Sequence, residues 1–506
     1  MMAAQATTPG PTLQFLLQDI ATVPGTDDVP LPGITSDSRR VQPGWLFVAY
    51  EVPGQSNIEY INDAIRAGAA AVVAEHSAIP AHYLCPVPLV RVRQLQKSVG
   101  ILADRFYSHP SANMTVIGVT GTNGKTSVSH MLARSLSELT GIPTGLIGTL
   151  GCGLLPDLQP GLNTTPEAIS LQAILADMRD GQASHVVLEV SSHGVDQQRI
   201  AGVHFAMAIL TNVSRDHLDY HRSMKNYVAV KRRLFTDYGI SKVVVNLDDT
   251  LGLELARSLP GDVELMGYTL DQQRYADNAG RSCIYGKIRQ QQLGNMQIHI
   301  RSPRGEGMIN SRLFGRHNAS NLLAALSALC LLDIPLENSI RVLEQYGNVP
   351  GRLECINKNG SATFVVDYAH TPDALRHVLQ TLKPLCNGRL YCIFGCGGER
   401  DKGKRTEMGE VAAQFADSIT LTNDNPRHED PDEIITAIKI GTAAHERVNV
   451  ITDRKQAILA VSREAGPNDI VLVAGKGHEK FQDINGVKQP FSDQQVIHEL
   501  LEDGGA

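Results

Sequence analysis

The stretch from Val116 to His130, VIGVTGTNGKTSVSH, decides the fold of this chain. The residues from Met114 to Val119 are mostly apolar and β-branched, which predicts a buried strand. The segment Thr120–Thr126 is small, polar and rich in glycine, and the apolar spacing from Ser127 to Leu139 is helical. A strand, a glycine-rich loop and a helix in this order are the layout of a phosphate-binding loop.

Each residue type in this loop has a physical reason to be there. Gly121 and Gly124 let the backbone fold closely around a polyphosphate, and the following helix directs its free N–H groups and positive dipole end at the anion. Lys125 adds a positive charge that reaches the outer phosphates, and Thr126 offers a hydroxyl to Mg²⁺. The first glycine of the usual G-x-x-x-x-G-K-[ST] pattern is replaced by Val119. A chance glycine-rich turn is disfavoured because GKT lies at the required junction of strand and helix.

Length and composition indicate a soluble protein of several domains. The chain has 506 residues, with 42% hydrophobic and 20% charged residues, which is typical of globular proteins. Its net charge of −7 argues against broad nucleic-acid binding. We identify no apolar run long enough to span a bilayer, no signal peptide and no C-x-x-C pair among the eight cysteines. The chain is therefore expected to be cytoplasmic and not inserted in a membrane.

Turn-rich breaks divide the sequence into three α/β segments, so we expect three domains covering 1–111, 112–347 and 348–506. The first is a small α/β domain, the second a P-loop ATPase domain with a mostly parallel sheet, and the third a Rossmann-like, doubly wound domain. The turn at 347–354 is the expected linker to the third. The other predicted strands are 44–50, 69–75 and 88–92; 184–190, 206–213 and 242–248; and 362–369, 389–398, 418–424 and 469–475.

Polar residues follow two strands of the central segment. Glu189 closes an apolar strand downstream of the phosphate loop, where a Mg²⁺-binding carboxylate is expected. After the next strand, Asp216, His217, Asp219 and His221 lie within six residues. The spacing of the two histidines would also suit zinc, although no cysteine pair or third histidine lies nearby. A solvated acidic loop is the further alternative.

Strand ends in the third segment combine basic and acidic side chains. Arginine binds a carboxylate in a bidentate manner and acids hold an ammonium, so this combination suits a zwitterionic ligand. Ordinary surface ion pairing is the alternative for any one of these loops. The residues concerned are Arg400, Lys402, Lys404 and Arg405; Asp424, Arg427 and Glu429; and Lys476, His478 and Glu479.

The order of the motifs resembles one family over nearly the whole chain, the Mur ligases. The motifs are TGTNGKTS, NTTPE, EVSSHG, TNVSRDHLDYH, NYVAVKRRLF, GRHNASN, VPGRLE, DYAHTPDAL, GCGGERDKGKR, DNPRHEDP and AGKGHEKFQD. The N-terminal SDSRRVQPGWLFVA is similar to the uridine-binding domain of that family. The loop EVPGQSNIEYIND departs from the family's spacing, so no uridine contact is assigned to it.

The resemblance implies an ATP-dependent amide ligase of peptidoglycan synthesis, with Mg²⁺ as cofactor. ATP would phosphorylate the free D-Glu carboxylate of UDP-N-acetylmuramoyl-L-alanyl-D-glutamate. An amine of meso-2,6-diaminopimelate would then attack the acyl phosphate. A cytoplasmic monomer acting on small molecules alone is implied, and the held phosphate would serve to activate a carboxylate.

The resemblance also implies roles for single residues at the ATP end. Lys125, Glu189, His217 and Lys231 would be catalytic, and Lys231 lies where the family has a carbamylated lysine. Without the resemblance, Lys231 would be interpreted as part of a basic helix face. Mg²⁺ would be held by Thr126, Glu189 and His217. ATP would be bound by Gly121, Thr122, Asn123, Gly124, Lys125, Thr126, Ser127, Asn318, Arg352 and Asp367.

Two further sets follow from the resemblance. By themselves, Thr164 and Thr165 would be interpreted as the N-cap of a helix. The nucleotide substrate would be bound by Ser36, Ser38, Asn163, Thr164, Thr165, Ser191, Gln197 and Arg199. Diaminopimelate would be bound by Arg400, Asp424, Asn425, Pro426, Arg427, Gly475 and Glu479. A buried arginine lacking the distal carboxylate of diaminopimelate would discriminate against lysine.

Several alternatives stay open at this point. The same ligase could use L-lysine or L-ornithine. A sister ligase, such as the next Mur ligase or folylpolyglutamate synthase, is disfavoured by DNPR and GKGHE. A P-loop kinase or nucleotide switch would not need the third domain, and a guanine-specific N-K-x-D is absent after the later strands. The four intact catalytic candidates argue against a catalytically inactive relative.

Overall fold

The structure is a computed structural model that describes residues 10–23, 28, 30–50, 57–161, 163–278, 281–347, 351–358 and 360–503. Its contacts divide the chain into two compact units. The first unit comprises Met1–Val119, Thr140–Ala208 and Arg233–Ile240, and the second comprises Thr120–Leu139, Ile209–Arg232 and Ser241–Ala506. Both contain helices and parallel strands, which confirms the predicted α/β class. The expected linker at 347–354 and the loop at 51–63 lie partly outside the described residues.

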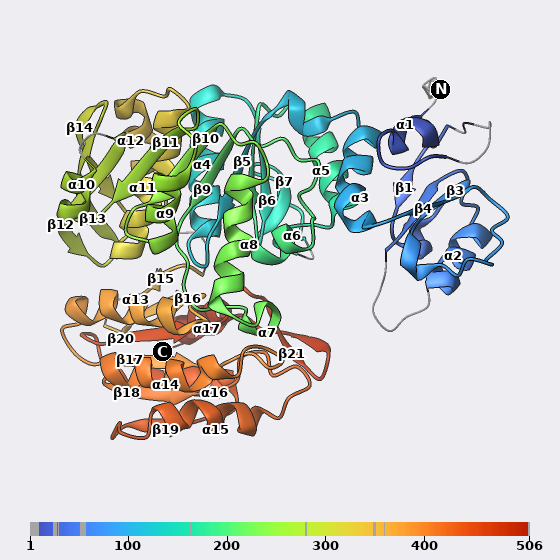
Figure 1. Cartoon of the computed structure of the whole chain (residues 1–506). Coiled ribbons are helices and arrows are strands. Elements are labelled where there is room, and N and C mark those ends of the chain that lie inside the picture. The colour runs from blue at the N-terminus through green and yellow to red at the C-terminus, as the bar shows by residue number, and fades with distance from the viewer. Residues whose placement is uncertain are drawn as a thin grey trace, which may run out of the picture. The chain divides into compact units, whose positions relative to one another are not determined.

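A four-stranded parallel sheet, in the order β1-β2-β3-β4, opens the first unit (Figure 1). Because side chains alternate along a strand, the sheet buries both faces: one packs against α1 and α3, the other against α2. The three strands predicted here are confirmed as β2, β3 and β4. The bounds are β1 (Ile34–Thr35), β2 (Leu46–Ala49), β3 (Ala71–Glu75), β4 (Leu89–Val92), α1 (Leu13–Leu17), α2 (Asn57–Arg66), α3 (Leu95–Phe106), η1 (Ser38–Arg40), η2 (His76–Ala78) and η3 (Pro110–Asn113).

The phosphate-loop strand, β5, belongs to a sheet of ten strands in the order β14-β13-β12-β11-β10-β9-β5-β8-β6-β7. In the first unit, β5, β8 and β6 run parallel and β7 pairs antiparallel at the edge. The strands predicted at 114–119, 184–190 and 206–213 are confirmed. The bounds are β5 (Thr115–Thr120), β6 (Thr144–Gly148), β7 (Gly151–Leu154), β8 (His185–Glu189), β9 (Met207–Leu210), α5 (Ala168–Asp180) and α6 (Ser192–Asp196).

The same sheet becomes antiparallel in the second unit. The strand predicted at 242–248 is confirmed as β10, and it runs parallel to β11 and β12, which were not predicted. Strands β12, β13 and β14 pair antiparallel, and that pairing was not predicted either. The bounds are β10 (Lys242–Asn246), β11 (Glu264–Thr269), β12 (Cys283–Gln292), β13 (Asn295–Ser302), β14 (Gly305–Ser311), α4 (Lys125–Thr140), α7 (Leu218–His221), α8 (Met224–Thr236), α9 (Thr250–Ser258), α10 (Gln272–Asp277), α11 (Arg316–Leu331) and α12 (Leu336–Glu344).

The last sheet, in the order β15-β16-β20-β17-β18-β19, is doubly wound as predicted (Figure 1). Its core is split between α13, α14 and α15 on one face and α16 and α17 on the other. Only β15 pairs antiparallel among its described strands. The bounds are β15 (Glu354–Ile356), β16 (Thr363–Asp367), β17 (Leu390–Phe394), β18 (Ser418–Leu421), β19 (Val448–Val450), β20 (Ile470–Ala474), β21 (Phe481–Ile484), β22 (Val487–Pro490), α13 (Pro372–Leu382), α14 (Gly403–Phe415), α15 (Pro431–Gly441), α16 (Arg454–Glu464), α17 (Asp493–Asp503) and η4 (Lys383–Leu385).

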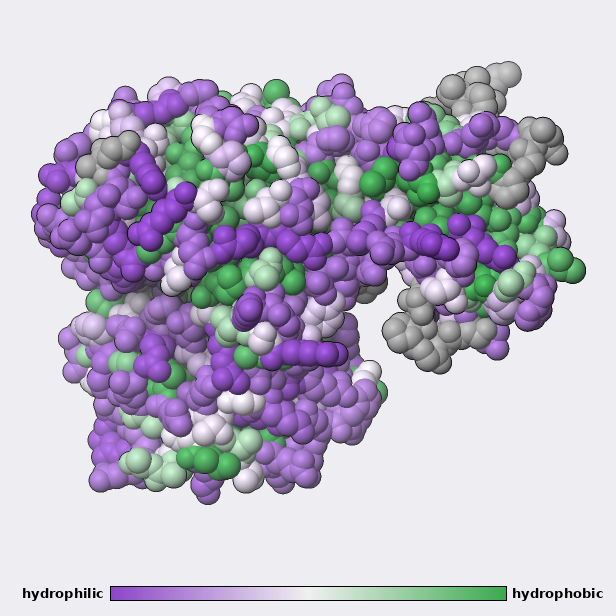
Figure 2. All heavy atoms as spheres, in the orientation of Figure 1, coloured by the Kyte–Doolittle hydropathy of each residue, from purple (hydrophilic) through white to green (hydrophobic). Residues whose placement is uncertain are grey.

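Figure 2 shows a face that is mainly hydrophilic, with hydrophobic residues in scattered patches. None of the described helices combines the length and the apolar character that a membrane span needs.

Candidate active site

The phosphate loop joins β5 to α4 through two glycines with positive φ, Gly121 at +151° and Gly124 at +85°. A Cβ at Gly121 would lie 1.9 Å from Thr211 Oγ1, and one at Gly124 would lie 2.4 Å from Asn321 Oδ1. Only glycine therefore fits at either position. The loop has the close-approach backbone that a polyphosphate site needs, so it fits the predicted ligand.

Two lysines converge on one carbonyl of this loop. Lys125 Nζ donates to the carbonyl oxygens of Gly121 and Thr122, both at 2.9 Å. Lys231 Nζ, from α8, donates to the same Gly121 oxygen at 2.8 Å. Two lysine side chains thus share a site beside the phosphate cradle.

Lys231 is in an environment that disfavours its charge. Its side chain is buried, and its Nζ lies 4.7 Å from the centre of the Tyr227 ring. Burial, followed by the charge of Lys125, holds the pKa of Lys231 well below its usual value, against the opposing effect of Asp216 and Asp249. The chain therefore provides a lysine that is readily neutral, and neutral amines are nucleophilic.

The loop after β9 contributes a buried carboxylate, Asp216. Its Oδ1 accepts a hydrogen bond from the backbone N–H of His217 at 2.9 Å, and its Oδ2 lies 3.4 Å from His217 Nε2. Burial opposes ionisation of Asp216, but His217, His370 and Lys404 outweigh it and lower the pKa to about 2. His221 packs against the Tyr227 ring at 5.2 Å, and no third ligand joins the two histidines among the described residues, so the zinc alternative gains no support.

The remaining phosphate-loop residues are held by partners that the sequence analysis missed. Thr122 Oγ1 lies 3.0 Å from the Tyr227 hydroxyl. The backbone N–H of Asn123 donates to Asn212 Oδ1 at 3.0 Å. Thr126 and Ser127 lie buried in the first turn of α4. Tyr227 lies within NYVAVKRRLF, one helical turn before Lys231 on the same helix face, which is the signal that could have identified it.

The three predicted adenosine-side residues lie on separate elements. Asn318, buried in α11, donates to the Phe314 carbonyl at 2.9 Å. The Arg352 guanidinium lies 4.6 Å over the Tyr368 ring. Asp367, at the end of β16, accepts from the Leu353 N–H at 2.7 Å. Burial raises the pKa of Asp367, and the nearby Arg352 charge opposes that rise.

The predicted amino-acid site centres on Asn425. Lys476 Nζ donates to Asn425 Oδ1 at 3.0 Å and to Glu479 Oε2 at 2.8 Å, and Asn425 Nδ2 also donates to Glu479 Oε2 at 2.8 Å. A Cβ at Gly475 would lie 2.4 Å from Asp424 Oδ2, so Gly475 leaves room for that carboxylate. Burial raises the pKa of Asp424, while Lys476 and Arg454 oppose the rise.

Arg427 and Arg400 flank Gly397. A Cβ on Gly397 would lie 3.1 Å from Arg427 Nη1 and 3.8 Å from Arg400 Cγ. Arg427 is half-buried with φ +53°, and its backbone is held by Asp483 and Asn485 of the β21–β22 hairpin. Arg400 is exposed.

Two other basic residues at these strand ends, Lys404 and Arg405, face carboxylates of the chain itself. Arg405 is buried and donates to both carboxylate oxygens of Glu429, at 3.0 and 2.9 Å. Lys404 is buried within range of Asp216. These two residues therefore give no support to a zwitterion site, because their charges already face carboxylates of the chain.

Two glycines of the second unit, Gly351 and Gly477, bring their backbone segments into close contact. A Cβ on Gly351 would lie 2.2 Å from the backbone nitrogen of His478, and a Cβ on Gly477 would lie 2.8 Å from the backbone oxygen of Gly351. Both have positive φ, +69° and +51°. The start of the C-terminal segment is thereby pressed against the loop that carries Glu479.

In the first unit, Glu189 ends β8 as a fully buried carboxylate. The Thr149 N–H donates to its Oε1 at 3.0 Å and the Thr149 hydroxyl donates to its Oε2 at 3.1 Å. A Cβ on Gly148 would lie 2.1 Å from Oε1. The chain thus orients this carboxylate closely, and Thr149 is a contact that the sequence did not reveal.

Thr165 and Ser191 are hydrogen-bonded to each other beside Glu189. The Thr165 hydroxyl donates to the Glu189 carbonyl at 2.8 Å and accepts from the Ser191 N–H at 3.0 Å. Thr164 lies beside Thr149, with 3.1 Å between their hydroxyl oxygens, whereas Asn163 is exposed. The N-cap of α5 is Glu167, so the alternative of a threonine N-cap is wrong.

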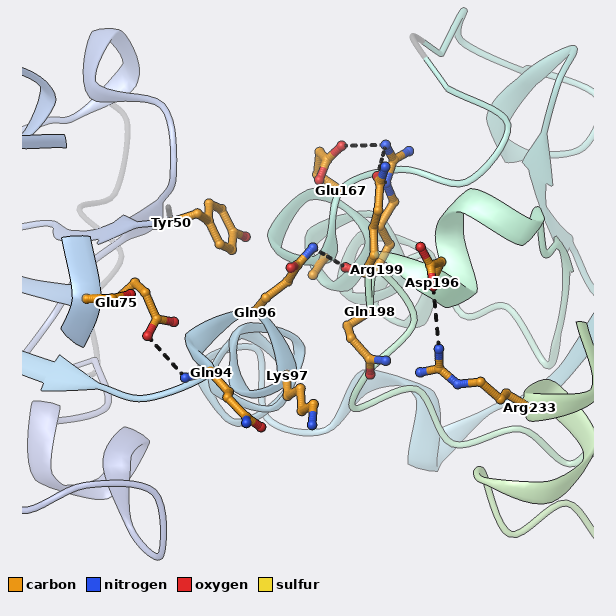
Figure 3. Close-up of a pocket in the computed structure, with 13 residues that line it drawn as sticks. Tyr50, Glu75, Gln94, Gln96, Lys97, Glu167, Asp196, Gln198, Arg199 and Arg233 are labelled. Atoms are coloured by element: carbon orange, nitrogen blue, oxygen red, sulfur yellow. Dashed lines mark hydrogen bonds and ion pairs between the residues drawn. The ribbon is translucent and has the colours of Figure 1, made fainter. Parts of the chain in front are cut away.

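A pocket of about 810 Å³ lies within the first unit (Figure 3). Arg199 on its wall donates to the Thr165 carbonyl at 2.8 Å and pairs with Glu167 at 3.0 Å and with Gln197. Tyr50, also on the wall, is hydrogen-bonded to Ser36. Ser38 begins η1 a short way along the chain. Sequence reasoning missed other lining residues: Tyr50, Glu75, Ser77, Gln94, Gln96, Lys97, Asp196, Gln198 and Arg233.

Comparisons with known proteins agree on one family. The Mur ligase middle domain matches residues 119–329, and the Mur ligase glutamate ligase domain matches residues 351–477. A UDP-N-acetylmuramoyl-L-alanyl-D-glutamate--2,6-diaminopimelate ligase of Coxiella burnetii is 44% identical over 476 residues, 94% of this chain and 96% of the relative. The enzyme of the same name from Ectopseudomonas mendocina is 44% identical over 469 residues, 92% of this chain and 94% of the relative. A solved structure of a ligase with that name has a TM-score of 0.69 and 33% identity, covering 98% of this chain and 100% of its own.

Proposed function

The chain belongs to the Mur ligase family, and from that premise we propose that it joins meso-2,6-diaminopimelate to UDP-N-acetylmuramoyl-L-alanyl-D-glutamate at the expense of ATP. The observation that carries the proposal is the pair of lysines on the Gly121 carbonyl, because a P-loop kinase or switch has no need of the buried Lys231. We also propose the three domains 1–111, 112–347 and 348–506, and the two family matches fall within the last two of them.

The reaction uses the phosphate loop to activate a carboxylate. The D-Glu carboxylate attacks the γ-phosphorus of ATP, the bond to the β–γ bridging oxygen breaks, and ADP leaves with its electron pair. An amine of diaminopimelate then attacks the acyl phosphate, and the tetrahedral intermediate collapses to the amide and phosphate. Lys125 and the helix end of α4 stabilise the phosphate charge that develops.

The donor set of the chain fits Mg²⁺. A hydroxyl and a carboxylate are the hard oxygen ligands that this ion prefers, and in the proposed enzyme Thr126, Glu189 and His217 would hold it. When bound, Mg²⁺ neutralises charge on the phosphates.

Lys231 is proposed as the carbamylated lysine of the family. Its neutral amine can attack CO₂, forming a C–N bond and releasing a proton, which gives an anionic carbamate. Such an anion beside Lys125 would form an attractive ion pair with that lysine. A lowered pKa of Lys231 favours this reaction because protonated amines do not react.

The pocket of the first unit is proposed as the site of the nucleotide substrate. Its polar wall, with Arg199 and Gln197 next to Thr165 and Ser191, suits the sugar and peptide. Ser36 lies beside Tyr50 on the wall, and Ser38 follows it at the proposed uridine end, whereas Asn163 and Thr164 belong to the peptide end.

Diaminopimelate is proposed to bind in the Asn425 network. Arg427 and Arg400 match its distal carboxylate, and Asp424 and Glu479 match its ammonium. Pro426 and Gly475 are proposed as further members of this site, Pro426 because it precedes Arg427 and Gly475 because it lies against Asp424. Lysine would leave Arg427 without its anion, which is the basis of the proposed discrimination.

Phosphate release tests this function. The full chain is assayed with ATP, Mg²⁺ and UDP-N-acetylmuramoyl-L-alanyl-D-glutamate, together with diaminopimelate, L-lysine, L-ornithine or no amine. Release with diaminopimelate alone is expected. Release with lysine or ornithine would overturn the pocket assignment, and silence with every amine in a protein that binds ATP would overturn the substrate assignment. We further propose that the chain is cytoplasmic and monomeric. Light scattering of the purified chain tests the monomer by measuring its mass in solution.

A further inference from the structure

Asp104, His109 and His204 bring three metal-ligating groups together in the first unit, and none of the three is given a role above. Asp104 lies in α3, His109 is in the turn that precedes η3, and His204 lies in the loop before β9. Their ligand atoms all lie within 4.8 Å of one another. They are the one such group of three found among the described residues.

The carboxylate is the fixed member of this group. Asp104 is 4% exposed. Its Oδ2 lies 2.6 Å from His109 Nδ1 and 3.9 Å from His204 Nε2. Its Oδ1 is buried and has no hydrogen-bond partner within the described chain. A buried carboxylate oxygen without a partner calls for a further ligand, such as a bound ion or water.

The two histidines approach from fixed backbone. The His109 N–H donates to the Asp104 carbonyl at 2.8 Å, and the His204 N–H donates to Ser111 Oγ at 3.0 Å. The loop before His204 presses on α3, since a Cβ on Gly100 would lie 2.0 Å from the Ala201 oxygen. The imidazoles themselves are half-exposed, so they can rotate towards an ion while their backbones stay in place.

A hydrogen-bonded Asp–His pair is the simpler interpretation, and it accounts for His109. It does not account for the unpaired Oδ1 or for a second imidazole from a distant segment. Two imidazoles and a carboxylate are a donor set that zinc takes readily. With bonds of about 2.0 to 2.1 Å, tetrahedral ligands lie roughly 3.3 Å apart, so the separations need only small rotations.

We propose that Asp104, His109 and His204 bind one Zn²⁺ ion, with the fourth position taken by water. The ion would fasten the C-terminal end of α3 and η3 to the loop before β9. This site is independent of the proposed ligase reaction. The proposed role is to hold these three segments together, since each ligand comes from a different one.

Zinc binding to the full chain tests the proposal. The protein, freed of any affinity tag and stripped with a chelator, is titrated with Zn²⁺ by calorimetry in excess Mg²⁺. The expected result is one tight equivalent, which His204→Ala weakens by ~100-fold or more, because even residues behind a ligand change affinity by 10- to 100-fold. Co²⁺ in the same site should give the intense visible absorption of tetrahedral coordination, and His204→Ala should abolish it.

The controls separate this site from others. His82→Ala removes an exposed histidine of the same unit outside the cluster, and it should leave zinc affinity unchanged. His204→Ala leaves the Asp104–His109 bond intact, so it is the variant expected to fold normally. No tight equivalent in the natural protein would overturn the proposal. An equivalent that survives His204→Ala but is lost in His217→Ala would also overturn it.

Discussion

The phosphate loop and the Asn425 network hold charge by different means. At the phosphate loop, glycine backbone makes the cradle and two lysine side chains share the Gly121 carbonyl. Around Asn425, side chains from the ends of β18 and β20 bind one another, and Lys476 and Glu479 depend on the asparagine between them. The first site therefore depends on local chain geometry and the second on a tertiary network. Variants that damage one site should leave the other intact.

The largest effect is expected at the phosphate loop. Lys125→Ala removes the charge facing the transferred phosphate, and kcat should fall by ~10³-fold, as for loss of a group that stabilises charge in the transition state. Phosphate release under saturating substrates measures it. Lys225→Ala, an exposed lysine on α8, is the matched control and should be near neutral. A loss below 10-fold would mean that Lys125 has no such role.

The second-largest effect is expected at the buried ion pair that supports the Asn425 network. Arg454 and Asp493 form a fully buried ion pair, and Arg454 also donates to the Ala474 carbonyl at 2.9 Å. Arg454→Met leaves a buried acid unpaired and should lower the free energy of unfolding by about 3 to 5 kcal/mol. Urea unfolding measures it. Lys455→Met, at an exposed pair on the same helix, should change it by about 0.5 kcal/mol or less. Equal effects would refute the role of burial.

The preference for diaminopimelate over lysine should depend on Arg427, and the expected loss of kcat/KM is smaller than the loss of kcat at Lys125. Arg427→Ala removes the partner of the distal carboxylate, so kcat/KM for diaminopimelate should fall ~10²-fold and the preference over lysine should shrink. The KM for ATP should not change, because the two sites are built separately. Arg447→Ala, an exposed arginine, serves as the control. If the preference over lysine is retained, Arg427 does not read that carboxylate.

The smallest effect is on pH dependence. Burial, then the charges of Arg352 and Lys476, lower the pKa of His478 to about 4 from 6.5. Between these values the unfolded chain binds a proton that the folded chain does not, so the free energy of unfolding falls as pH falls. His478→Gln should reduce that loss by about 1 kcal/mol between pH 7.5 and 5.5. Urea unfolding at both pH values, with His82→Gln as control, measures it, and equal losses in both variants would contradict the assignment.

The contrast between the two sites also explains what the sequence could reveal. The residues Gly121 to Thr126 lie together in the chain, so local patterns were enough to predict their strand, loop and helix correctly. The antiparallel strands β13 and β14 and the roles of Lys404 and Arg405 escaped prediction, because they depend on what those residues pack against in three dimensions. The resemblance named Lys231, and only the structure shows it buried against Gly121.

The same limit applies to the first unit. Glu189 was predicted as a carboxylate at a strand end, but Thr149, which binds both of its oxygens, lies on another strand's loop. Tyr50 and the other pocket residues that were not predicted, apart from Arg233, lie outside any recognised motif. His204 gives no signal at all, because its partners are Asp104 and His109, far away in the sequence.

The close backbone contact between Gly351 and Gly477 restricts which sequence changes the chain can accept. Neither position can acquire even a methyl group unless the facing chain moves, because each would have to occupy space already filled by backbone. A larger residue at either glycine must therefore be matched by a change in the facing loop. Changes at the two glycines are therefore expected to occur together, because the backbone at each one limits the space at the other.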